Sequence, residues 1–146
     1  MKIAMGCDHG GYDLKEEVKK HLQEKGIEVV DFGTNSLDSC DYPDFGIAAA
    51  KAVAKGECEK GIVICTTGIG ISIAANKVKG IRCALCSDLT SARLTREHND
   101  ANVLAMGAAV VGHLVALDIV DMFISTEFSG LEKHSRRIKK ISEAEM

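Results

Sequence analysis

The chain has 146 residues, of which 46% are apolar and 27% charged, with a formal net charge of -3. This length suits one globular domain that buries its own core without disulfide or metal staples. No apolar run approaches the ~20 residues of a membrane span, and the acidic balance argues against a dedicated nucleic-acid binder.

The cysteines and the N-terminus bear on the cellular compartment. MKIAMGCDHGG has no long apolar stretch before a cleavage site, so a secretion signal is not expected. The six cysteines are therefore expected to be reduced thiols of a cytoplasmic protein, most of them packed in the core. Cys83 and Cys86 lie three apart in a predicted strand and should face opposite sides, which argues against a metal or redox pair.

Apolar runs of strand length alternate along the chain with segments of helical spacing. KIAMGC (2–7) is the first predicted strand, and a helix from Tyr12 closes near Gly26. A second strand (27–33) leads through a loop with the only proline to a helix over about 45–55. The remaining predicted elements are a strand at 61–65, a helix to about residue 78, a strand at 80–86, a helix capped by Ser87 or Asp88, a strand at 101–107 and a helix at 113–126.

Short apolar strands that alternate with helices predict a parallel sheet covered on both faces. With right-handed crossovers, the prediction is a three-layer α/β/α sandwich of one domain (1–146), Rossmann-like, with five strands in the flavodoxin-type order. Ligands of such sheets bind beyond the carboxyl ends of the strands. That rule selects the loops CDHGG, DFGTN, CTTGIG and SD.

The CTTGIG loop, residues 65–70, matches none of three familiar phosphate loops. A dinucleotide fingerprint requires glycine where Ile73 stands, a Walker loop requires Gly-Lys-Ser/Thr, and a cysteine phosphatase requires arginine where Ile71 stands. Backbone amides at such a turn can still form an anion-binding concavity, and they favour the thiolate of a nearby cysteine. Cys65 is therefore either a base or nucleophile, or a buried cysteine before a packing turn.

Other polar residues are candidates for the same site. Asp8 and His9 end the first strand on the same edge of the sheet, and His98 and Asn99 lie in EHND, between a helix and the last strand. The segment KHSRRIKK (133–140) carries five positive charges, which suits a small multivalent anion such as a phosphate ester. Its alternative is a solvated helix face.

Six motifs in register give the chain a specific resemblance. CDHGG, DYPDFG, CTTGIGISIAANK, GIRCAL, TREHND and NVLAMG together resemble the ribose-5-phosphate isomerase type B family, which also includes galactose-6-phosphate isomerase subunits. The EHND and GISIAANK segments favour the ribose branch. The resemblance implies an aldose–ketose isomerase of carbohydrate metabolism, in the pentose phosphate pathway, that works through a cis-enediolate without metal or cofactor.

The resemblance also implies catalytic roles. Cys65 would be the base that moves a proton between C2 and C1, and His98 would assist opening of the furanose ring with help from Asp8. Thr67 would lie beside O1 and O2, and the amides of residues 66–70 would stabilise the enediolate oxygen. A glutamate-base variant has its base at the position of Ile71, so this chain resembles the cysteine type.

Substrate-binding roles follow in the same way. His9, Lys133 and Arg137 would hold the phosphate and Asn99 a sugar hydroxyl, although Arg136 is an alternative to Arg137. His98, Asn99 and the basic tail would come from a neighbouring subunit, so a homodimer or a dimer of dimers is expected, with sites at the subunit interface. The residues implied to bind substrate are His9, Tyr42, Thr66, Gly68, Ile69, Gly70, Asn99, Lys133 and Arg137.

Three departures from the family pattern fall in the substrate site. Thr66 replaces a usual glycine, and it would be strained if that position needed a positive φ. Ala109 stands where a phosphate-binding arginine is common, and Lys133 replaces a second arginine. Ribose 5-phosphate stays the leading substrate. A six-carbon phosphate such as allose or galactose 6-phosphate, and a sugar-phosphate-binding paralogue without turnover, are the alternatives.

Overall fold

A computed structural model describes residues 1–145 of the chain. Within them, five strands form one sheet, and every pair of neighbouring strands is parallel, as the sequence predicts. The order across the sheet is β2-β1-β3-β5-β4. The strands are β1 (Lys2–Cys7), β2 (Glu28–Asp31), β3 (Lys60–Cys65), β4 (Cys83–Leu85) and β5 (Val103–Gly107).

The predicted strand order is wrong for the last two strands. A flavodoxin-type sheet runs 2-1-3-4-5, whereas here β5 lies beside β3 and β4 takes the edge. The reason is burial. All five residues of β5 are buried, as an interior strand requires, while β4 has three residues and Leu85 is exposed. A short, half-covered strand is suited to an edge.

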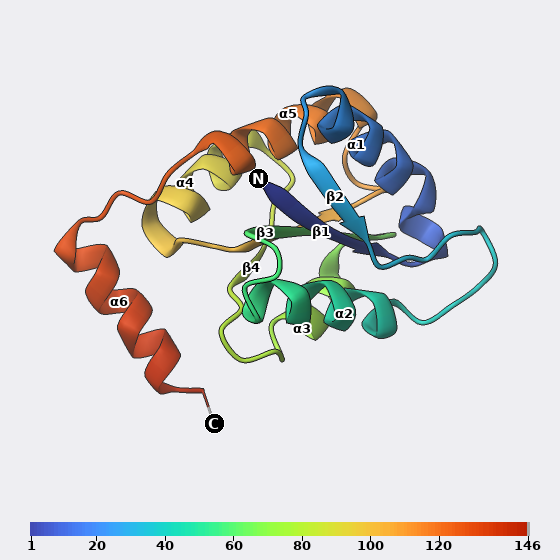
Figure 1. The fold of residues 1–146 in the computed structure, drawn as a ribbon. Coiled ribbons are helices and arrows are strands. Elements are labelled where there is room, and N and C mark those ends of the chain that lie inside the picture. The colour runs from blue at the N-terminus through green and yellow to red at the C-terminus, as the bar shows by residue number, and fades with distance from the viewer. Residues whose placement is uncertain (146) are drawn as a thin grey trace.

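Helices cover both faces of the sheet (Figure 1). The helix that contains the only proline starts earlier than predicted, for a local reason. Pro43 lies in the first turn of its helix, where a missing amide hydrogen costs nothing, so this helix starts at Tyr42 rather than near residue 45. Within the described residues the α-helices are α1 (Tyr12–Glu24), α2 (Tyr42–Ala54), α3 (Ile69–Ala75), α4 (Leu89–Asn99), α5 (His113–Ser125) and α6 (Glu132–Glu143).

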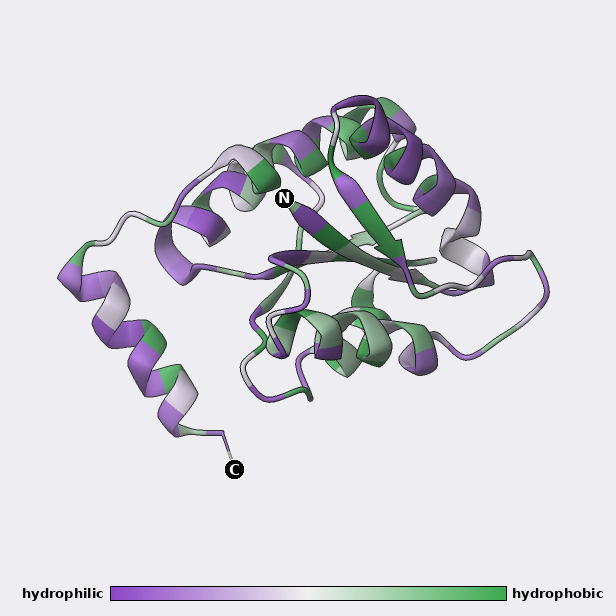
Figure 2. Cartoon of the chain, in the orientation of Figure 1, coloured by the Kyte–Doolittle hydropathy of each residue, from purple (hydrophilic) through white to green (hydrophobic). Residues whose placement is uncertain are grey.

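Two hydrophobic cores lie on opposite faces of the sheet. Ile3 and Met5 of β1 pack with Phe123 on the side of α1 and α5, whereas Ala4 packs with Ile71 on the side of α2 and α3. Figure 2 shows these strands as the apolar centre of the fold and α6 as mostly hydrophilic. The sandwich thus leaves the ends of the strands, not the faces of the sheet, as places for a ligand.

Cys83 and Cys86 pack into these two different cores, so the prediction that they face opposite sides is confirmed. All six cysteines, which fall within the described residues, are free thiols. None of the helices in residues 1–145 has the length and apolar character needed to cross a membrane.

Candidate active site

The loop after β3 brings a backbone amide to the Cys65 sulfur. Cys65 is the last residue of β3 and is 4% exposed, and the Gly68 amide donates a hydrogen bond to its Sγ at 3.1 Å. Gly68 has φ 78°, and a Cβ there would approach the Met106 carbonyl carbon to 2.7 Å. Only glycine fits this turn. The thiolate is the form of a cysteine that acts as a base or nucleophile, and this amide points at the atom that would carry the charge.

The two threonines beside Cys65 are exposed and differ in their contacts. Thr67 Oγ1 accepts a hydrogen bond from the Ile69 amide at 3.2 Å. Thr66 does not have a positive φ, since Asp100 is the only non-glycine residue in 1–145 that does, so the strain considered for Thr66 does not arise. Its hydroxyl instead lies against Gly10, where a Cβ would come within 2.2 Å of Thr66 Oγ1. The substitution thus fills space beside the loop.

Asp8 and His9 lie on the same edge of the sheet. Asp8 is buried and its Oδ1 accepts a hydrogen bond from the Gly11 amide at 3.1 Å, which caps the short 3-10 helix His9–Gly11. His9 Nδ1 accepts from the Cys40 amide at 3.2 Å. Because Nδ1 is an acceptor, a neutral His9 ring carries its proton on Nε2. Both residues line a cavity of about 480 Å³ together with Tyr42.

Tyr42 closes this edge by packing on the glycine loop. A Cβ on Gly70 would come within 2.5 Å of Tyr42 Cζ, so glycine is required at position 70 to let the aromatic ring approach. The first turn of α2 thereby contacts the first turn of α3. Nine of the residues implied by the resemblance therefore lie on one edge: Asp8, His9, Tyr42, Cys65, Thr66, Thr67, Gly68, Ile69 and Gly70.

His98 and Asn99 lie at the opposite edge of the sheet. They are the last two residues of α4, not part of the turn in which the sequence placed them. Arg82, immediately before β4, donates from Nε to the Asn99 carbonyl at 2.9 Å, so α4 ends where the strands begin. Cys65 stands where the strands end. One chain therefore does not bring His98 and Cys65 together.

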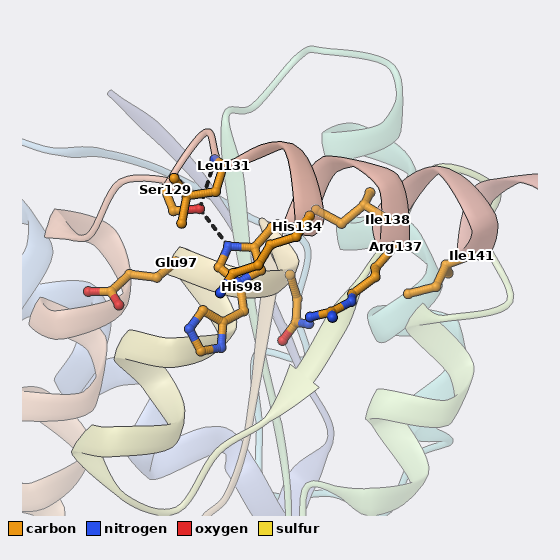
Figure 3. A pocket seen from close by; sticks show the side chains of 10 residues that line it. Glu97, His98, Ser129, Leu131, His134, Arg137, Ile138 and Ile141 are labelled. Atoms are coloured by element: carbon orange, nitrogen blue, oxygen red, sulfur yellow. Dashed lines mark hydrogen bonds between the residues drawn. The ribbon is translucent and has the colours of Figure 1, made fainter.

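A second cavity of about 490 Å³ lies beside His98 and Asn99 (Figure 3). Its other wall is α6, which contributes Lys133, Arg137 and His134. Arg136 instead pairs with Glu132 one turn earlier, at 2.6 Å. Of the two arginines that the sequence left as alternatives, Arg137 is the one that lines the cavity.

The end of α4 is held in place by buried polar contacts. Arg96 is buried, and its guanidinium donates to the Asp100 carboxylate at 2.8 Å and to the Thr126 and Ala101 carbonyls at 3.0 and 2.6 Å. Asp100 has φ 45° and ends the helix in the left-handed conformation. These contacts fix the backbone from which His98 projects.

A buried ion pair lies at the same end of the sheet as Cys65, between α1 and the end of β2. Lys15 is fully buried and donates from Nζ to both carboxylate oxygens of Asp31, at 2.8 and 2.9 Å, and to the Thr34 carbonyl at 2.6 Å. Burial alone would raise the pKa of Asp31, but hydrogen bonds from Lys15, the Gly33 amide and Lys19 outweigh it and lower that pKa. Burial likewise raises the pKa of the adjacent Cys7 thiol to about 12, so Cys7 stays protonated.

Several of these residues have no role predicted from the sequence, namely His134, Ser129, Cys40, Lys15 and Arg96. His134 had a usable signal, because Leu131, Ile138 and Ile141 recur with it at helical spacing and mark an apolar face of α6. Lys15 had none, since a lysine beside core positions of a helix is normally solvated. Within residues 1–145 no group of three or more histidine, cysteine or acidic side chains is arranged to hold a metal ion.

The fold and its strand-end cysteine define a class: parallel α/β sandwich proteins with a glycine loop and polar side chains at the carboxyl edge of the sheet. Residues 3–141 match the Ribose/Galactose Isomerase family, so the chain belongs to this family of sugar-phosphate isomerases. Ribose-5-phosphate isomerase B of Escherichia coli (strain K12) is 51% identical over 144 residues, which is 99% of this chain and 96% of that protein.

Two further comparisons agree with this membership. The structure of Clostridium thermocellum ribose-5-phosphate isomerase B superimposes with a TM-score of 0.96 at 58% identity, over 98% of this chain and 96% of that one. The galactose-6-phosphate isomerase subunit LacB of Clostridium acetobutylicum is 42% identical over 143 residues, 98% of this chain and 83% of that protein. The predicted family is confirmed.

Proposed function

We propose that this enzyme interconverts ribose 5-phosphate and ribulose 5-phosphate, as a cytoplasmic protein of the pentose phosphate pathway, with Cys65 as the base. The contact that carries the proposal is the hydrogen bond from the Gly68 amide to Cys65 Sγ. It places a sulfur that accepts an amide hydrogen bond on the edge that also holds Asp8 and His9. The family and its ribose-5-phosphate isomerase B members support the substrate.

The reaction is a proton transfer between adjacent carbons. The Cys65 thiolate takes the proton from C2 of the open aldose, and the electron pair left on C2 forms the C1–C2 double bond of a cis-enediolate. Thr67 and the amides of residues 66–70 stabilise the oxygen that becomes negative. A proton then passes from O2 to O1, the sulfur returns its proton to C1, and the electron pair of O2 forms the C2 carbonyl of the ketose.

The remaining roles belong to groups at both edges. His98, assisted by Asp8, opens the furanose ring, because only the open aldose has an acidic C2 proton. Lys133, Arg137 and His9 bind the phosphate, and Asn99 a sugar hydroxyl. Lysine offers a point charge where arginine offers a two-pronged donor, so Lys133 is the weaker ligand.

A complete site of this kind requires a second copy of the chain, since the groups lie on opposite edges. Exposed apolar side chains near the Cys65 edge support such an interface: Ile69 and Ile73 lie one turn apart on α3, and Leu114 in the first turn of α5 is 80% exposed. We infer a homodimer or a dimer of dimers.

The test is turnover of ribose 5-phosphate by Cys65→Ala, with Cys58→Ala as a matched control. Cys58 is also buried, but it lies before β3 at the opposite edge. Removal of the base should lower kcat by about 10²–10⁴, while the Cys58 variant keeps wild-type rates. Deuterium uptake at C2 from heavy water should fall in parallel. A fully active Cys65→Ala enzyme refutes the assigned base, and an inert wild type, without exchange, identifies a binding protein.

A six-carbon substrate is the second candidate, and one contact favours it. The Ala109 amide donates to the Thr66 carbonyl at 2.9 Å, so two departures from the family pattern adjoin each other at the rim. An alanine in place of an arginine leaves room for a longer sugar. Values of kcat/KM across ribose, allose and galactose phosphates decide the case, and higher values for the pentose remove this candidate.

A further inference from the structure

His134 is a buried residue that the proposed reaction does not use. It is 7% exposed and is the buried residue of α6, whose other side chains are largely exposed and charged. It lies between the end of α4 and the segment that leads into α6, with Phe128 6.5 Å away between ring centroids. His134 therefore lines the cavity proposed to bind substrate without having a role in the reaction described above.

Ser129 forms a hydrogen bond with one ring nitrogen of His134. Ser129 Oγ accepts a hydrogen bond from the Leu131 amide at 3.2 Å, so its own hydrogen is available for His134 Nδ1, which lies 2.6 Å away (Figure 3). When Ser129 donates this hydrogen, Nδ1 is the acceptor and the neutral ring carries its proton on Nε2. Ser129 is itself tied to α4, because its amide donates to the Glu97 carbonyl at 3.1 Å.

The charges around His134 oppose its protonation. Burial, and then the neighbouring His98, Lys133 and Arg137, lower the pKa of His134, and the single carboxylate that acts in the other direction is Glu97 of α4. These groups come from both helices that pack on the ring. His134 is therefore a neutral imidazole at neutral pH.

The neutral ring lies directly against His98. The two ring centroids are 4.4 Å apart and the planes are tilted by 36°. His98 is exposed at the end of a helix and would otherwise adopt several rotamers. A flat neighbour restricts it, and a neutral neighbour does not repel the imidazolium that forms when His98 accepts a proton.

We propose that His134 is a positioning residue for ring opening: held in place by Ser129, it stacks on His98 and fixes the orientation of that ring. The inference rests on the proposed role of His98 and deepens it. A direct phosphate contact by His134 is the competing role, and the two roles differ in what they predict. Positioning affects the step that needs an open ring, whereas a lost phosphate ligand weakens both substrates alike.

The two directions of the reaction separate these roles. Ribulose 5-phosphate is acyclic, because its C5 oxygen carries the phosphate, so exchange of its C1 hydrogen with heavy water needs no ring opening. We expect His134→Leu to lower kcat for ribose 5-phosphate by about 10- to 100-fold with KM within about twofold. Its C1 exchange on ribulose 5-phosphate should keep the wild-type rate.

Ser129→Ala tests the hydrogen bond, and Ser135→Ala is its matched control. Ser135 is an exposed serine of α6 that lies outside the cavity. Ser129→Ala should reproduce the selective loss on ribose 5-phosphate to a smaller degree, and Ser135→Ala should leave both rates unchanged. Thermal unfolding of each variant shows whether it is folded.

A measurement that needs no turnover completes the test. Two-bond proton–nitrogen spectra of nitrogen-15 histidine-labelled protein report each ring's tautomer and charge. His134 should be the neutral Nε2–H tautomer at pH 7, and Ser129→Ala should make it easier to protonate and His98 harder. A charged or Nδ1-protonated His134, or an equal loss on both substrates, overturns the inference. A wild type inert on ribose 5-phosphate refutes the proposed function instead, whatever the spectra show.

Discussion

At the scale of single residues, Lys15 and Asp31 form a buried ion pair between a helix and the sheet. Lys15 has 0% exposure, and its three acceptors are two oxygens of Asp31 and the Thr34 carbonyl. The pair joins α1 to the last residue of β2, and Lys15 also contacts Thr34 in the loop that carries Cys40 to His9. A buried pair adds little compared with apolar residues, but loss of one partner strands the other charge.

Asp31→Asn should therefore lower the free energy of unfolding by about 3 kcal/mol at pH 7. The hydrogen bonds to Asp31 lower its folded pKa, so its contribution is present above the unfolded value of about 4 and is lost as the pH falls through the folded one. Urea unfolding at several pH values should show a constant difference between wild type and variant above about pH 5, and a smaller one in stronger acid.

The control for this experiment is Asp118→Asn, because Asp118 is exposed on α5. Its unfolding free energy should stay within about 0.5 kcal/mol of wild type. A difference between wild type and Asp31→Asn that persists unchanged to pH 3 would contradict the linkage to Asp31.

At the scale of elements, the helices and strands can be predicted from local periodicity in the sequence. The order of the strands cannot, because it depends on which strands pair over long distances along the chain. The parallel sheet and the helices that cover it follow from the alternating pattern of apolar runs. The strand order does not, because both GIRCALC and ANVLAMG are apolar runs, and the pairing of β5 with β3 depends on which of them is buried throughout.

The candidate site divides in the same way. The turn after β3 can be predicted from the sequence, because Gly68 and Gly70 follow Cys65 closely at the end of an apolar run. The cavity beside His98 is harder to predict from the sequence. Its second wall is α6, and only the fold shows that His134 faces His98 across it.

The C-terminus of α4 is the element on which His98 depends, and Arg96 holds it. Arg96→Lys cannot reach the Thr126 and Ala101 carbonyls and the Asp100 carboxylate together. We expect a loss of about 2 kcal/mol in unfolding free energy, because buried carbonyls lose their donors. A fall in kcat should accompany it as His98 shifts.

Arg93→Lys is the matched control, one turn earlier on α4. Arg93 is exposed and pairs with Glu97 at 3.2 Å, a contact worth about 0.3–0.5 kcal/mol. Urea unfolding and ribose 5-phosphate turnover are measured on both variants. Equal effects of the two substitutions would show that Arg96 has no special role.

At the scale of the whole molecule, the proposed active site needs residues from two copies of the chain, and this can be tested by mixing variants. Cys65 and Thr67 lie on one edge of the sheet and His98 on the other, so we expect each active site to combine the Cys65 edge of one copy with the His98 edge of another. Cys65→Ala and His98→Asn subunits should each be nearly inactive alone. A mixed dimer of the two has one site with both defects and one site with neither.

Random reassembly of equal amounts of these two variants should restore about a quarter of the wild-type activity, because half of the dimers are mixed and half of their sites are intact. Cys65→Ala mixed with Thr67→Ala is the control. Both defects then lie on the same edge, every site keeps one of them, and no activity should return. Steady-state rates of the separated mixed dimers decide the outcome. If the first mixture stays as inactive as the second, each site lies within one chain, and the cavity beside His134 and Arg137 needs another explanation.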